Sequence, residues 1–223
     1  MSTLVENLAH PSNRVLEPTE RISEVLFALI MVLTFTCSFS VADAGRAEVR
    51  TMLIGALGCN LAWGIIDAIF YLMGSFSEFG QCILKLKALR QASSPFDAHQ
   101  IIAHALPPVV ASVLSTSELE GLRQKLTLLP EPPSRPKLRK GDFLGAFAVF
   151  LIIILTTLPV VIPFTFIEDV RRALRVSNGI ALVMLFLTGY AFGRYAGHRP
   201  LAMGVTMVVL GGALVAITIF LGG

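Results

Sequence analysis

The sequence predicts an all-α integral membrane protein with five transmembrane helices and a helical cytoplasmic insert between the second and the third. Hydrophobic residues make up 54% of the 223-residue chain and charged residues only 15%, whereas an ordinary soluble domain is about 25% charged. Five apolar runs are long enough to cross about 30 Å of hydrocarbon. These predicted spans are residues 25–42, which Ile22 extends, 51–73, 143–165, 176–196 and 201–221.

Basic residues set the expected orientation, because Lys and Arg accumulate in loops that stay in the cytoplasm. Thirteen of the 18 lie before the first span, between the second and third, or after the fourth. We therefore expect a cytoplasmic tail (1–21), two helices within 22–73, a cytoplasmic insert (74–141) and three helices within 142–223, with the C-terminus outside. The lipid bilayer is the expected environment.

A cleaved signal peptide is the alternative for the N-terminal region. The stretch VADAG at 41–45 contains an A-x-A cleavage pattern after an apolar run. The region before that run carries four glutamates, whereas a signal peptide begins with a basic region. We therefore expect the first span to be retained.

Several function classes lack their usual signals. No CxxC, HExxH, GxSxG or P-loop pattern occurs, so we expect a protein that is not an enzyme and place a membrane hydrolase last among the alternatives. Aromatic and basic residues are not interleaved as in nucleic-acid-binding domains, and no nucleic-acid partner is expected. Cys37, Cys59 and Cys82 are too few for a disulfide framework, so we expect three thiols.

The predicted insert divides into helical pieces and a Pro-rich, basic linker. Apolar residues at helical spacing within 79–89 predict an amphipathic continuation of the second span. Pro95 interrupts it, and a helix over DAHQIIAHAL follows. The next helix is expected at STSELEGLRQKL, where Ser117 and Glu120 have capping-box spacing.

Asp97, His99 and His104 form a metal-like group in the insert. Imidazole and carboxylate suit divalent transition metals. The two histidines are five residues apart, however, which directs them about 140° apart around a helix. The favoured interpretation is therefore a set of solvated surface residues.

The second span carries the polar residues of greatest interest. Asn60 and Asp67 lie seven residues apart and share one helix face, about 10 Å apart along its axis. If the first two spans are antiparallel and start level at the cytoplasmic side, Met31 lies level with Asp67, and Cys37 lies close to Asn60. This mixed set of ligands fits Fe(II) or Mn(II) better than Mg or Ca.

Each of these residues also has a structural interpretation. Acids inside the membrane are functional by default, so function is favoured for Asp67 over a hydrogen-bonding role in the bundle. For Asn60 a functional and a structural role are equally favoured, since a buried amide can also join two helices by a hydrogen bond. Core packing is the alternative for Met31 and Cys37. Glu24 is either an interfacial acid near a helix start or an acid at the entrance of an ion path.

Two further patterns in the spans remain open. In TTLPVVIPF, Pro159 and Pro163 each remove an amide donor, which produces either a plain kink or carbonyls that line an ion path. Small residues allow close helix packing, either within one chain or between subunits. They are Gly55, Gly58, Ala62, Gly204, Gly211 and Gly212.

The chain resembles the vacuolar iron transporter family, as a divergent bacterial-type member. RISEVLFALI is similar to the entry of the family's first span, NLAWGIIDAIFYLMG to its second and LPVVIPF to its third. ALRVSNGIALVMLFLTGYAFGRYAGHRP is similar to the fourth span and GGALVAITIFLGG to the last. The resemblance covers most of residues 21–223 and implies a homodimer in a bacterial plasma membrane that exports Fe(II) or Mn(II), often in exchange for protons.

The resemblance also implies ligand positions, from which this chain departs. The family uses a first-span aspartate and a second-span methionine, whose places are taken here by Met31 and Ala68, with Asp67 beside the latter. The two ligand types are thus exchanged between helices. The insert of the family carries acidic metal ligands, whereas residues 74–141 hold only five acidic residues against nine basic ones, so a metal-collecting insert is not expected here.

The sequence therefore predicts a dimeric transporter that moves Fe(II) or Mn(II) as cargo, exchanges it for protons and holds no permanently bound cofactor. The expected metal ligands are Asp67, Asn60 and Met31, with Glu24 and Cys37 as further candidates. The alternative is a scaffold or regulatory membrane protein of the same fold that does not transport.

Overall fold

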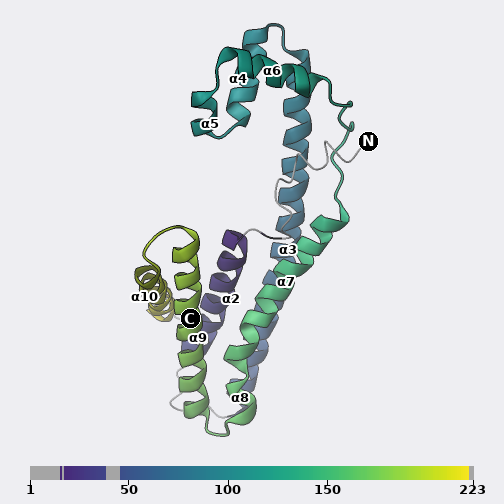
Figure 1. Cartoon of the computed structure of the whole chain (residues 1–223). Helices are drawn as coiled ribbons and strands as arrows, with labels where there is room; N and C mark the ends of the chain where they lie inside the picture. The colour runs from purple at the N-terminus through teal and green to yellow at the C-terminus, as the bar shows by residue number, and fades with distance from the viewer. Residues whose placement is uncertain (1–15, 17, 39–45, 221–223) are drawn as a thin grey trace. The chain divides into compact units, whose positions relative to one another are not determined.

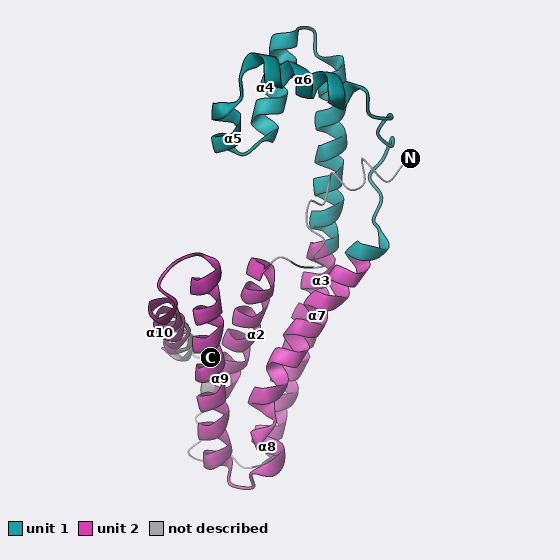
Figure 2. Cartoon of the chain, viewed as in Figure 1, with its two compact units in different colours: residues 1–13, 72–142 teal, residues 14–71, 143–223 magenta. Residues whose placement is uncertain are grey.

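The computed structural model describes residue 16 and residues 18–38 and 46–220, and within these ranges the regular structure is entirely helical. The chain forms two compact units (Figure 2). Leu72–Asp142 form the insert unit. Arg14–Tyr71 and Phe143–Gly223 form the span unit.

The span unit contains the apolar helices (Figure 1). They are α2 (Pro18–Ser38), the first part of α3 (Arg46–Gln91), α7 (Lys140–Val161), α8 (Pro163–Phe166), α9 (Val170–Tyr195) and α10 (Pro200–Phe220). Three described segments are long and apolar enough to cross a bilayer: Ala47–Gln91, Lys140–Phe166 and Val170–Tyr195. They cover the predicted second, third and fourth spans, apart from residue 196 at the end of the fourth. The chain is thus an integral membrane protein.

The first and fifth predicted spans remain predictions as membrane crossings. Residues 25–38 of the first lie in α2, and the remainder, 39–42, lie outside the described residues. The helix itself begins at Pro18, earlier than expected, because proline is well tolerated in the first turn, where no amide donor is needed. The fifth span coincides with α10 as far as Phe220.

The centre of the span unit is a buried apolar cluster contributed by α2, α7 and α9. Leu29, Val32, Leu33, Val160, Ala181 and Leu185 belong to it. Two buried hydroxyl groups accompany it. Thr36 Oγ1 donates to Asn178 Oδ1 at 2.9 Å, and Ser177 Oγ donates to the Val160 carbonyl at 2.6 Å. The second bond satisfies a carbonyl in the last turn of α7, which ends at Val161, just before Pro163.

Glycines allow α9 and α10 to approach closely within the chain. A Cβ on Gly189 would lie 2.7 Å from the Met203 carbonyl oxygen, and a Cβ on Gly193 would lie 2.8 Å from the Pro200 Cα. From the other side, a Cβ on Gly204 would lie 2.7 Å from the Phe186 ring. At these positions the small residues serve packing inside one subunit.

The insert unit is a small helical domain built on the second half of α3. That helix runs unbroken to Gln91, which confirms the predicted continuation of the second span. It is followed by α4 (Pro95–Ala105), α5 (Pro108–Val113) and α6 (Thr116–Thr127). The core of the unit comprises Leu86, Leu89, Ala98 and Ile102, with half-buried leucines of α6 packed against it.

The capping box of α6 is two residues earlier than predicted. Ser115 is the N-cap, its side chain accepts from the Glu118 amide, and the Glu118 carboxylate accepts from the Ser115 amide at 2.8 Å. The expected pairing of Ser117 with Glu120 was wrong, because the extended residue Leu114 lets the helix start earlier. Glu120 is therefore free to hydrogen-bond to His99 of α4 at 3.0 Å.

The Gly189→Ala variant tests the contact between α9 and α10. The new methyl group meets a backbone oxygen that cannot rotate away, so we expect a loss of about 1–3 kcal/mol in the free energy of unfolding. Gly179→Ala is the matched control in the same helix, because a Cβ there meets nothing within 4 Å. Thermal unfolding in detergent, followed by circular dichroism, should show a lower Tm for Gly189→Ala only. Equal Tm values would contradict the close approach.

Glu120 should give the insert unit a pH-dependent contribution to stability. Hydrogen bonds from Arg123, then from His99, lower the pKa of Glu120 from 4.5 to about 2. Because the folded state lowers this pKa, the stabilisation is complete above about pH 4.5 and is lost as the pH falls toward 2. Glu120→Gln should therefore lower the Tm at pH 7, and the difference from wild type should shrink between pH 4.5 and pH 2.5.

The control for this prediction is Glu131→Gln in the Pro-rich linker, whose carboxylate makes no hydrogen bond or ion pair to the described residues. We expect that variant to match the wild type at both pH values. A Glu120→Gln difference that stays constant down to pH 2.5 would contradict the assignment.

Candidate metal site between α2 and α3

Three contacts fix the register of α2 against α3. The Phe27 and Trp63 rings lie edge to face with centroids 5.3 Å apart. A Cβ on Gly55 would lie 3.5 Å from the Phe35 ring. The third contact is a hydrogen bond between the carboxyl groups of Glu24 and Asp67. In each pair the residue number rises along α2 as it falls along α3, so the two helices are antiparallel.

This register corrects the expected pairing of Met31 with Asp67. The expectation assumed that both helices start level at the cytoplasmic side, but α3 continues to Gln91 and has no end there. Packing of Phe27 on Trp63 sets the register instead. Met31 then lies level with Cys59 and Asn60, about 10–12 Å along α3 from Asp67 at 1.5 Å per residue.

The contact between Glu24 and Asp67 is the feature of the candidate site that the sequence analysis did not foresee. Both residues were candidates, but they were not placed together. Each side chain is half-buried between the two helices. A hydrogen bond between two carboxyl groups needs a proton on one of them, because an ionised carboxylate only accepts. Such a pair can instead hold a cation, which takes the place of the shared proton.

Asn60 combines a structural contact with an unused oxygen. Its side chain is 1% exposed, and Nδ2 donates to Thr157 Oγ1 of α7 at 2.8 Å. The same hydroxyl donates to the Ile153 carbonyl at 2.9 Å. Asn60 thus ties α3 to α7. Its Oδ1 is buried and has no hydrogen-bond partner among the described residues, so it is an available oxygen ligand.

The sulfur-bearing side chains lie on a different level from the carboxylates. Met31 and Cys59 are both half-buried, and helical spacing places them level with each other. Cys59 was expected only as a thiol, since nothing in the sequence alone fixed its register. The Cys37 side chain lies outside the described residues. The expected mixed set is therefore divided into an oxygen pair and, about 10 Å away along the axis, a sulfur and amide level.

The metal-like group of the insert does not assemble. His99 Nε2 lies 3.0 Å from Glu120 Oε2, and His104 Nδ1 lies 2.8 Å from the Gln100 carbonyl oxygen. The Asp97 carboxylate accepts a hydrogen bond from Ser94, the N-cap of α4, at 2.8 Å. These separate contacts agree with the expectation that the three residues do not form a metal site. The interpretation as solvated surface residues was wrong for His99, whose side chain is only 13% exposed and contacts Glu120 of α6. Over the described residues as a whole, no three His, Cys, Asp or Glu side chains gather into a group that holds a metal.

Comparison with known proteins identifies the family. No curated protein matches the chain. The VIT family model matches residues 94–223, which include α4 to α6 and the span helices α7 to α10 but neither α2 nor α3 as far as Gln91. Glu24 and Asp67 lie outside the matched range, so their role as a site rests on their contact alone. The match covers more than half of the sequence, and the chain belongs to the VIT family of membrane transporters.

Proposed function

We propose that the protein exports Fe(II) or Mn(II) from the cytoplasm in exchange for protons, and that Glu24 and Asp67 bind the metal. Membership of the VIT family gives membrane transport of metal ions in general. The observation that supports the finer proposal is the carboxyl pair between α2 and α3. Acids at such positions are costly unless they serve a pathway or a partner.

The chemistry of the carboxyl pair accounts for the proposed exchange of metal for protons. In the empty state the hydrogen-bonded carboxyl groups hold a proton between them. A divalent ion binds both carboxylates only after that proton has left, because metal and proton compete for the same oxygens. Binding from one side and release to the other then couples metal movement to proton movement in the opposite direction.

A homodimer would complete the coordination. Mn(II) and Fe(II) favour several oxygen or nitrogen ligands, and one chain offers two carboxylates at this level. In a dimer with twofold symmetry the same patch of both subunits meets. An axis beside α2 and α3 would bring two such pairs together. Asn60 Oδ1, with Met31 and Cys59, would form a second binding position farther along α3.

The second candidate function is a scaffold or regulatory membrane protein that does not transport. Its supporting observation is that the described residues hold no group of three His, Cys, Asp or Glu side chains. In that case Glu24 and Asp67 would share a proton permanently and join α2 to α3 as a structural contact.

Flux into proteoliposomes under an imposed pH gradient tests the proposal. We expect wild-type protein to move Fe(II) and Mn(II), and we expect Asp67→Asn and Glu24→Gln each to reduce the flux to the level of empty liposomes. Both variants keep the shape of the side chain and remove the charge that the metal requires. Glu48→Gln is the matched control, because that carboxylate is exposed at the start of the same helix α3.

The outcomes separate the two candidates. Flux in wild type and Glu48→Gln, without flux in the two pair variants, supports the metal site. Unchanged flux in both pair variants rules out this site. No flux from folded, reconstituted wild-type protein favours the scaffold.

A further inference from the structure

The insert unit contains a pocket of about 650 Å³ between α3, α4 and α6. This volume lies within the range of about 300–1,000 Å³ that is typical of small-molecule sites. The lining of the pocket has two chemically different sides, one apolar and one polar. All of the lining residues belong to the insert unit, so the pocket is a property of that unit alone.

The apolar side comes mainly from α4 and α6. Ile101 and Leu106 line it from one helix and its C-cap, and Leu122 and Leu126 line it from the other. These four side chains pack on the core of the unit but remain only half-buried. Each keeps an apolar surface open to the pocket, and covering such surface is favourable by about 25 cal/mol per Å².

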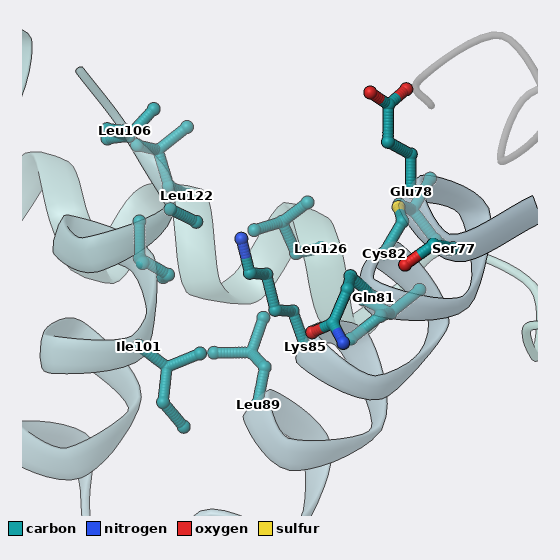
Figure 3. Close-up of a pocket in the computed structure, with 14 residues that line it drawn as sticks. Ser77, Glu78, Gln81, Cys82, Lys85, Leu89, Ile101, Leu106, Leu122 and Leu126 are labelled. Atoms are coloured by element: carbon teal, nitrogen blue, oxygen red, sulfur yellow. The ribbon is translucent and has the colours of Figure 1, made fainter. Parts of the chain in front are cut away.

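The polar side is one face of α3. Ser77, Gln81 and Lys85 follow one another at four-residue spacing and line the pocket together with Glu78. Figure 3 shows the Lys85 side chain extending from α3 toward the leucines of α6, whereas Glu78 is directed away from them. Lys85 forms no ion pair with any described residue, so its ammonium group is available to an anion.

We propose that this pocket binds a long-chain fatty acid, with its acyl chain against the leucines and its carboxylate on the Lys85 ammonium. A single positive group beside an apolar wall matches a ligand with one negative charge and one apolar chain. Glu78 lies two helical turns from Lys85, about 10 Å along α3, and disfavours a head group with more negative charge. This proposal is independent of metal transport.

Photolabelling of the full-length protein in phosphatidylcholine nanodiscs tests it. The probe is palmitate that carries a diazirine on its chain, and the comparison probe is the corresponding alcohol. After irradiation, mass spectrometry locates the labelled peptides. We expect palmitate to label residues 101–106 and 122–129, and we expect excess unlabelled palmitate to suppress that labelling. The alcohol should label these peptides much more weakly, because it lacks the carboxylate.

Three variants separate charge from shape. Lys85→Glu should reduce pocket labelling by roughly tenfold or more, as expected for loss of one charge-assisted hydrogen bond. Lys87→Glu makes the same charge change two residues away, outside the pocket lining, and should leave labelling unchanged. Ala105→Trp keeps Lys85 but fills the pocket from an exposed position on α4, and should prevent labelling.

Three results would overturn the proposal. They are labelling confined to the span helices, equal labelling by palmitate and the alcohol, and equal effects of Lys85→Glu and Lys87→Glu. None of these measurements involves metal. A negative labelling result would therefore not contradict the proposed transport function, and a negative flux result would not contradict fatty-acid binding in the pocket.

Discussion

The packing of α2 against α3 is the constraint on which the candidate site depends. The edge-to-face contact of Phe27 with Trp63, at 5.3 Å between centroids, fixes which residues of the two helices lie level. A shift of one helical turn would separate Glu24 from Asp67 by about 5 Å along the axis. The pair would then lose its hydrogen bond, and two half-buried acids would each need another partner.

The site is held from two sides. On one side α2 packs on α9 through the buried cluster around Leu29 and Leu185, and α9 in turn approaches α10 through glycines. On the other side Asn60 joins α3 to Thr157 of α7. The helices that carry the carboxyl groups therefore each have a further partner. This arrangement would suit the proposed site, in which the two carboxyl groups stay together while a proton is exchanged for a metal ion.

Much of this architecture could be predicted from the sequence, because apolar length and helical periodicity are local properties. The middle three spans, the continuation of α3 and the separation of His99 from His104 around α4 followed from them. The pairing of Glu24 with Asp67 could not be predicted, because register depends on the fit of aromatic rings from two helices. The level of Cys59 relative to α2 was missed for the same reason. The earlier start of α6 is different, because Ser115 and Glu118 also have capping-box spacing, and the sequence alone did not decide between that pair and Ser117 with Glu120.

Mn(II) binding to the reconstituted protein, followed by electron paramagnetic resonance, tests most directly whether Glu24 and Asp67 bind one ion together. Loss of a residue that only orients a metal ligand weakens affinity by about 10–100-fold, so loss of a ligand should weaken it at least as much. We predict this loss for Glu24→Gln and for Asp67→Asn, and little further loss for the double variant, since the two groups act as a unit. Wild-type affinity in either single variant would contradict a shared site between α2 and α3.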